Sequence, residues 1–292
     1  MANYSIWVLE YAYVPSYHVS GIVYGAHNQG YRKLPYCYVL IKGQGTVAMV
    51  DVGYNEKDVG AEMARRFGVE AWQNPETVLK QAGVKPEEVE HIFLSHAHFD
   101  HMGNTDAFPK AKFYLQEREL SKWVWAMALD ERFRWLNIAT DPGDVMRVVD
   151  LARQGRLELL DGDRDDVLPG IDIRKADDTH TWGCQFVTVR NGDRKGSDSW
   201  VLAGDLVYSF ENLEGQDPKA PTQYIPVGLA VGSQTNLLFT TDQMVKEGGG
   251  NLQRVIPVHE EGLRDRFPSR INDHGLRVTE LCLADGQRSL VS

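Results

Sequence analysis

The chain has 292 residues, 42% of them hydrophobic and 25% charged, so it can bury a sizeable core. Its formal net charge of −10 repels phosphate backbones and excludes nucleic acid as a partner. The apolar runs are strand-sized, the N-terminus lacks the basic start of a signal peptide, and the three cysteines are scattered, so we expect a cytoplasmic protein without a membrane partner.

Short apolar, β-branched segments bounded by Gly, Asp or Asn predict strands. In chain order they are residues 37–41, 46–53, 91–95, 112–115, 184–190, 200–205 and 255–260. Helical patterns lie between them, at residues 75–83, 116–136, 143–155 and 240–249. Because strands and helices alternate in both halves without a repeat or a long linker, we predict α/β architecture in a single domain over residues 1–292.

Metal-capable side chains gather directly after the predicted strand at 91–95. Residues 96–101 read HAHFDH and contain three histidines and an aspartate. Burying a single polar group without a partner costs about 2–7 kcal/mol, so a cluster of this kind needs a metal or another partner. We therefore interpret the segment as part of a metal site.

Three further candidates lie at strand ends, where α/β folds usually place their catalytic and binding residues. Asp205 and His259 end predicted strands, and His180 precedes one. A catalytic dinuclear site needs about three protein ligands for each metal and an open position for water. We assign the first metal to His96, His98 and His180, the second to Asp100, His101 and His259, and both to a bridging Asp205.

The pattern His-x-His-x-Asp-His, followed by a lone histidine, a strand-end aspartate and a final histidine, resembles the metallo-β-lactamase superfamily. The resemblance runs from residue 47 to His259. It implies a four-layer αβ/βα sandwich with a dinuclear site at the edge between two sheets. It also implies two divalent metal ions, zinc in the first place, with manganese, iron or cobalt as alternatives. Asp51 matches a strand-end Asp-x-Gly that family members carry near the site, in a supporting rather than a ligating role.

Several branches of the superfamily are disfavoured. The bridging Asp205 differs from the cysteine or serine of β-lactamases, the acidic charge disfavours the nucleases, and no sequence remains for the flavodoxin domain of flavodiiron enzymes. Tyr208, three residues after Asp205, resembles the tyrosine that points at the substrate carbonyl in N-acyl-homoserine lactonases and in pyridoxolactonase-like enzymes. Valine before His259 departs from the Gly-His of many family lactonases.

The resemblance therefore implies that a hydroxide bridging the two metals opens a lactone ring. Tyr208 would stabilise the oxyanion, and Asp100 would pass a proton to the departing alkoxide. Trp123 and Met127, four residues apart on one helix face, would form an apolar wall for an acyl chain or a ring, unless they are ordinary core. The three tyrosines in residues 10–21 could form a lid.

Two other functions stay open. One is hydrolysis of a cyclic amide, a cyclic imide or a thioester, as in glyoxalase II. The other is a non-hydrolytic iron protein, because the same ligands accept iron. In each hydrolytic case the partner is a small molecule, and the sequence also allows a homodimer.

Overall fold

The computed structural model describes residues 3–192, 198–217, 219 and 223–292, which form two β-sheets. The larger sheet contains, in spatial order, β12 (Ser269–Ile271), β13 (Arg277–Cys282), β1 (Tyr4–His18), β2 (Tyr31–Gly43), β3 (Thr46–Val50), β4 (His91–Phe93), β5 (Lys112–Gln116) and β6 (Leu157–Leu160). The smaller sheet contains β11 (Val255–Ile256), β10 (Ser199–Leu202), β9 (Gly183–Arg190), β8 (Ile171–Asp177) and β7 (Arg164–Leu168).

The larger sheet changes from antiparallel to parallel pairing at β3. Strands β12 to β3 are antiparallel, and strands β3 to β6 are parallel. In the smaller sheet, β7 to β10 are antiparallel and β11 pairs parallel with β10. The first two strands form a long hairpin that pairs from Tyr4–Gly43 to His18–Tyr31 and carries two register shifts.

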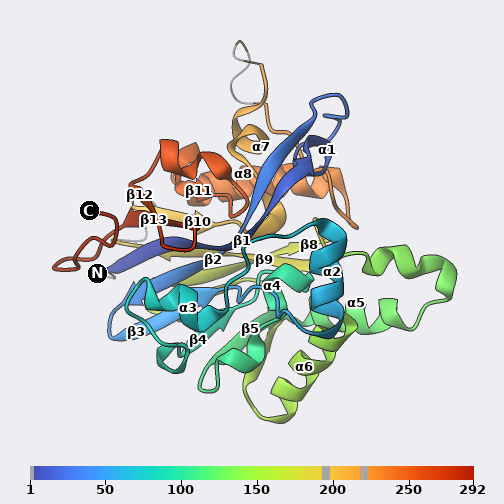
Figure 1. Cartoon of the computed structure of the whole chain (residues 1–292), viewed down its shortest axis with the longest axis horizontal. Helices are drawn as coiled ribbons and strands as arrows, with labels where there is room; N and C mark the ends of the chain where they lie inside the picture. Colours follow the sequence, from blue (N-terminus) through green and yellow to red (C-terminus); the bar gives the residue numbers. More distant parts are fainter. Residues whose placement is uncertain (1–2, 193–197, 218, 220–222) are drawn as a thin grey trace.

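The described residues form eight α-helices, several of which cover the outer faces of the sheets. They are α1 (Val19–Ile22), α2 (Asp58–Phe67), α3 (Pro75–Lys80), α4 (Phe99–Met102), α5 (Glu117–Met127), α6 (Pro142–Arg153), α7 (Phe210–Glu214) and α8 (Gln234–Glu247). Figure 1 shows α7 and α8 on one side of the paired sheets and α3, α4 and α6 on the other. Helix α8 packs on β8 and β10, whereas α6 packs on β6. This arrangement is the predicted αβ/βα sandwich.

Short 3-10 helices complete the described structure. They span Pro86–Glu88, Thr105–Ala107, Glu131–Asn137, Gly204–Leu206, Leu252–Arg254 and Glu261–Asp265. One of them breaks the predicted helix at 116–136, because α5 ends at Met127 and the Asp130 side chain accepts a hydrogen bond from the Arg132 backbone N–H instead of continuing the helix. The predicted strand at 46–53 ends at Val50, because Asp51 adopts a left-handed φ of 64°.

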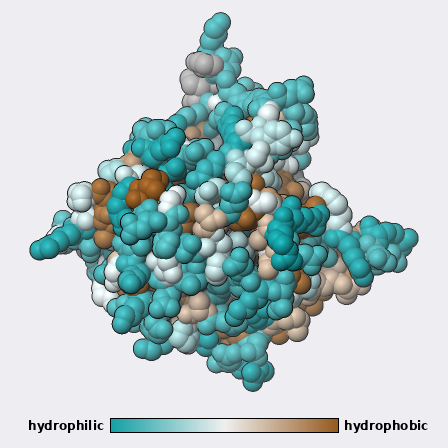
Figure 2. Space-filling view, viewed as in Figure 1, coloured by the Kyte–Doolittle hydropathy of each residue, from teal (hydrophilic) through white to brown (hydrophobic). Residues whose placement is uncertain are grey.

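The core lies between the sheets and beneath the helices. Strand β4 shows why these residues form a central strand: Ile92 and Phe93 have no exposed surface, as expected for a parallel strand that is covered on both faces. Phe113 of β5 and Phe186 of β9 are fully buried as well. The outer surface differs in character, because hydrophilic side chains cover most of the face in Figure 2. Among the described residues, no helix combines the length and the apolar composition that crossing a bilayer requires.

A buried polar side chain joins the two sheets. The Gln185 side-chain amide, on β9, donates to the carbonyl oxygens of Leu94 at 2.8 Å and Tyr114 at 3.0 Å, and its oxygen accepts from Gln116 at 3.0 Å. Gln185 is fully buried, so these carbonyl groups have no access to water as a substitute.

We expect Gln185→Leu to destabilise the protein by about 1–3 kcal/mol, because the Leu94 carbonyl loses the Gln185 donor, whereas the Tyr114 carbonyl keeps the Leu94 backbone N–H at 3.0 Å. The midpoint of urea unfolding measures this change. The same substitution at the exposed Gln253 is the control and should shift the free energy of unfolding by less than about 0.5 kcal/mol. Equal midpoints for both variants would show that these hydrogen bonds do not stabilise the sheet packing.

Candidate metal centre

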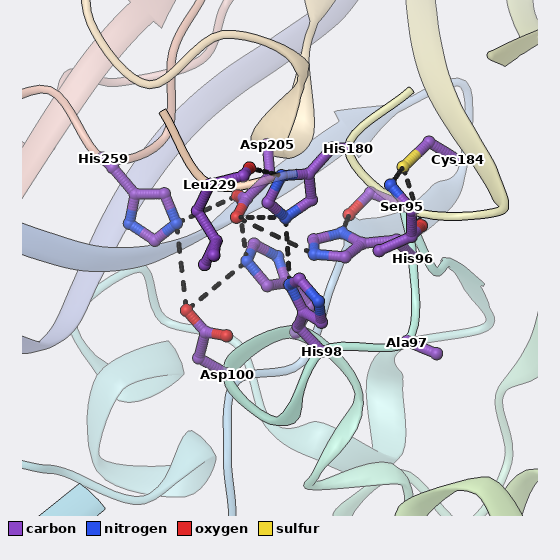
Figure 3. Close-up of polar contacts among 12 residues, drawn as sticks. Ser95, His96, Ala97, His98, Asp100, His180, Cys184, Asp205, Leu229 and His259 are labelled. Atoms are coloured by element: carbon purple, nitrogen blue, oxygen red, sulfur yellow. Dashed lines mark hydrogen bonds and ion pairs between the residues drawn. The ribbon is translucent and has the colours of Figure 1, made fainter. Parts of the chain in front are cut away.

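The seven predicted ligands lie close together, and Figure 3 labels six of them, His96, His98, Asp100, His180, Asp205 and His259. The segment after β4 supplies two of them, helix α4 two, the β8–β9 loop one, and the turns after β10 and β11 one each. All seven are buried, and Asp100 is the most exposed of them at 8%. Their ligand atoms form two groups, each within 4.8 Å: His96, His98, His180 and Asp205, and Asp100, His101 and His259. The structure thus brings together the same sets that were assigned to the two metals, and metal ligation itself stays a prediction.

The Asp205 carboxylate lies between the two groups and presents one oxygen to each. Its Oδ2 is 3.3 Å from His180 Nε2 and 3.7 Å from His96 Nε2. Its Oδ1 is 2.9 Å from His259 Nε2 and 3.0 Å from His101 Nε2. A carboxylate that bridges two metal ions requires this orientation.

Hydrogen bonds on the far side of three imidazoles fix which nitrogen faces the centre. Nδ1 of His180 donates to the Leu229 carbonyl at 2.7 Å, and Nδ1 of His259 donates to the Pro35 carbonyl at 2.6 Å. Nδ1 of His101 donates to Asp51 at 2.7 Å. Each bond places the ring proton on Nδ1 and leaves the Nε2 lone pair directed into the centre, as metal-binding histidines require.

His96 is oriented through a serine. The Ser95 hydroxyl donates its one proton to Asp51 Oδ2 at 2.7 Å, so it accepts the proton of His96 Nδ1, which lies 2.9 Å away. Asp51 Oδ1 also accepts the Ser95 backbone N–H at 2.7 Å. Asp51 therefore supports His96 in one group and His101 in the other, which is the supporting role that the sequence predicted. His98 differs, because its Nδ1 faces His180 Nε2 at 2.9 Å.

The nitrogen and oxygen atoms that face the centre are electron-pair donors of the kind that bind metal cations. Nε2 of His96, Nε2 of His101 and Oδ1 of Asp205 are buried, and none has a hydrogen-bond partner within the described parts of the chain. Several lone pairs and two carboxylates thus face one another at short range, an arrangement that positive charge stabilises. The residues present can hold two divalent metal ions, one in each group.

The two groups differ in electrostatics. In the first group, burial lowers the pKa of His98 to about 3, and burial together with the neighbouring His101 lowers the pKa of His96 well below its usual value. Both imidazoles are therefore neutral, which is the metal-binding form. In the second group, burial opposes a charge on His101, but Asp205, Asp100 and Asp51 outweigh it and raise its pKa well above the usual value. The carboxylates favour a positive charge at this position.

Tyr208 faces both groups across a small cavity. Its ring centroid is 4.9 Å from that of His259 and 5.7 Å from that of His180. Burial and the charge of Asp205 raise the pKa of Tyr208 well above its usual value, so the phenol remains a hydrogen-bond donor. The free space in the cavity is about 20 Å³, which is close to what one water molecule needs.

The cavity also contains residues that sequence reasoning did not assign to the site. Tyr36, Phe67 and Phe99 line it, and so does Tyr17 from the tyrosine-containing segment that was considered as a lid. Phe99 lies inside the HAHFDH motif, next to Asp100, so the sequence could have predicted that it lies at the site. Tyr36 and Phe67 come from segments far from the motif, and nothing in the sequence near them indicates that they lie at the site.

The predicted apolar wall lies elsewhere. Trp123 is fully buried, its indole N–H donates to Glu119 at 2.7 Å, and its ring centroid lies 6.1 Å from that of His98. Met127 is partly buried at the end of α5. Neither side chain lines the cavity that contains Tyr208, and their contact with substrate stays a prediction.

Comparisons with known proteins identify a family and a fold. The sequence profile of the metallo-beta-lactamase superfamily matches residues 31–266. An N-acyl homoserine lactonase from Bacillus cereus is 27% identical over 194 residues, which cover 63% of this chain and 68% of that protein.

Solved structures share the fold. An N-acyl homoserine lactone hydrolase, with the product N-hexanoyl-L-homoserine bound at its catalytic metal center, superposes with a TM-score of 0.64 at 17% identity, over 91% of this chain and 97% of that one. AidC, a dizinc quorum-quenching lactonase, gives a TM-score of 0.62 at 17% identity, over 94% of this chain and 92% of that one. These superpositions confirm the predicted fold.

We expect Asp205→Asn to weaken metal binding by both groups, because a neutral amide replaces the one carboxylate that faces both. Metal content per chain, measured by mass spectrometry after dialysis against zinc, should fall from two ions to less than one. Asp242→Asn, at a half-exposed carboxylate on α8, is the control and should keep full loading. Two tightly bound ions in the Asp205→Asn protein would contradict a bridging role.

Proposed function

The chain belongs to the metallo-beta-lactamase superfamily, and from this premise we propose that it is a metal-dependent hydrolase that opens the ester ring of a lactone, such as an N-acyl-homoserine lactone. The observation that carries the proposal is the position of Tyr208. Its ring lies against His180 and His259, in a cavity that ligands of both groups line. The lactonase relative from Bacillus cereus supports the same substrate class.

We propose that the seven ligands hold two divalent metal ions, with zinc as the first choice in view of the dizinc structural relative. Bound there, such ions would lower the pKa of water and polarise a carbonyl oxygen. The first group would offer three imidazoles, and the second two imidazoles and Asp100, with Asp205 shared between them.

The role that we propose for Tyr208 follows from its protonation state. Attack on a lactone carbonyl places negative charge on the carbonyl oxygen, and a fixed O–H donor at that point stabilises the transition state more than the substrate. Because its pKa is raised, Tyr208 keeps this proton across the physiological pH range. Burial of the ring also holds the hydroxyl in place without reorganisation.

We assign the leaving-group proton to Asp100. Its Oδ2 is 3.5 Å from His101 Nε2 and 3.8 Å from His259 Nε2, and it is the most exposed of the seven side chains. Burial acts to raise the pKa of this carboxyl, but His101 outweighs it and lowers the pKa. An ionised Asp100 would accept the proton that the attacking water gives up as the carboxylate product forms, and would pass it to the departing alkoxide, which leaves as an alcohol.

A hydrolysis assay with a pH indicator tests the function. The zinc-loaded protein should release acid from acyl-homoserine lactones of several chain lengths or from an aromatic-fused lactone, and the Asp205→Asn protein should not. The same panel contains a cyclic imide and a glutathione thioester. Turnover of these two substrates without turnover of any lactone would overturn the proposed bond, and no turnover of any substrate would overturn the hydrolase itself.

Tyr208→Phe tests the oxyanion role separately from metal binding. We expect kcat to fall by about 10²-fold, the effect typical of losing one oxyanion donor, while the metal content stays at the wild-type level. Tyr31→Phe, at a tyrosine that is 66% exposed, should leave kcat unchanged. A wild-type kcat in the Tyr208→Phe protein would remove Tyr208 from the mechanism.

A further inference from the structure

A buried carboxylate on α5 holds the segment that contains two of the candidate ligands. Glu119 lies in the first turn of this helix and has no exposed surface. Its Oε1 accepts the backbone N–H of Ala97 at 2.8 Å. Ala97 is the residue between His96 and His98, so this bond fixes the backbone from which both imidazoles project.

The same carboxylate holds the loop that contains the third imidazole of the first group. Glu119 Oε2 accepts the backbone N–H of Gly183 at 2.7 Å. The Thr181 hydroxyl lies 2.8 Å from each of the two carboxylate oxygens. Thr181 directly follows His180, so Glu119 joins the loop of His180 to the segment of His96 and His98.

The packing around these bonds leaves the loop little freedom. Helix α5 contacts β5 of the larger sheet and β9 of the smaller one, so it lies where the two sheets meet. A Cβ atom on Gly183 would lie 2.5 Å from the Glu119 backbone nitrogen, so the loop and the helix touch through their main chains. Arg118 adds a hydrogen bond to the Trp182 carbonyl at 3.0 Å and an ion pair with Asp178 at 2.6 Å.

The second group is held by other parts of the fold. His101 is bound to Asp51, and His259 is bound to the Pro35 carbonyl. The hydrogen bonds to Glu119 come from Ala97, Thr181, Gly183 and Trp123, and none of these residues belongs to the second group. A change at residue 119 should therefore act on one metal position more than on the other.

We propose that Glu119 is a positioning residue that sets the separation of His180 from His96 and His98, and so determines the affinity of the first metal position. Glu119 touches neither metal nor substrate in this role. The inference rests on the proposed metal centre and is independent of which bond the enzyme hydrolyses.

The hydrogen bonds to Glu119 make the substitution Glu119→Gln a specific test of the positioning role. The backbone N–H groups of Ala97 and Gly183 and the indole N–H of Trp123 can only donate. A glutamine has one accepting oxygen and one donating NH₂ group. In either orientation of the amide, the NH₂ group faces one of the two backbone N–H groups, so one ligand segment has to move away from the other.

The experiment compares Glu119→Gln with Glu280→Gln. Glu280 is a matched control, because it is also a buried carboxylate that accepts a tryptophan N–H, from Trp7 at 3.2 Å, and a backbone N–H, from Leu290 at 3.1 Å. Titration of the metal-free proteins with zinc, in competition with a chromophoric chelator, gives two dissociation constants per chain. Visible spectra of the cobalt-loaded proteins report the geometry of each position.

For Glu119→Gln we expect one dissociation constant to rise by about 10- to 100-fold and the other to stay within about threefold of wild type. One set of cobalt bands should change, whereas Glu280→Gln should match wild type in both measurements. Thermal unfolding of the metal-free proteins checks folding. If Glu119→Gln does not fold, Thr181→Val replaces the hydroxyl with a methyl group and is the second test. It should lower the metal affinity of the same position by a smaller factor.

Three outcomes would overturn the inference. Wild-type dissociation constants in both Glu119→Gln and Thr181→Val would show that the carboxylate has no positioning role. Equal weakening of both metal positions would show that Glu119 acts on the whole centre. Failure of the wild-type chain to bind two ions would overturn the proposed metal centre together with this inference, whereas either of the first two results would leave the centre intact.

Discussion

The structure depends on the convergence of electron-rich atoms around Asp205. Five imidazole nitrogens and two carboxylates meet in a buried space, with Asp205 oxygens 2.9–3.3 Å from the nearest nitrogens. Such atoms repel one another unless positive charge lies between them. The fold therefore has to hold each ring in place by contacts outside the centre. The Pro35 carbonyl, the Leu229 carbonyl and Asp51 provide these contacts, and each comes from a different part of the chain.

The two groups of candidate ligands share one supporting residue, Asp51, and the first group has a second one in Glu119. Asp51, at the end of β3, acts on His101 directly and on His96 through Ser95. The first turn of α5 acts on the loops that contain the first group. The first group contributes three imidazoles, the second contributes two imidazoles and Asp100, and Asp205 faces both.

The cavity beside Tyr208 is joined to the loop that holds His180. Gly228 and Leu229 donate backbone hydrogen bonds to Gly21 in α1, at the tip of the β1–β2 hairpin, each at 3.2 Å. The Leu229 carbonyl in turn accepts from His180. The hairpin that contributes Tyr17 to the cavity and the loop that fixes a candidate ligand are therefore directly connected.

The sequence by itself determined the α/β architecture and identified the seven side chains that meet at the centre, whereas their division between two metals stays a prediction. Local signals suffice for these features, because an apolar run marks a strand and a polar residue at its end lies at the sheet edge. Only the tertiary structure decided which way Asp205 points, that Glu119 joins two ligand segments, and that Trp123 is buried rather than at the cavity. Helix periodicity places Glu119 and Trp123 on α5, but it carries no information about which distant loop packs against them. Contacts between segments far apart in sequence depend on how the two sheets pack, and that packing is a property of the whole chain.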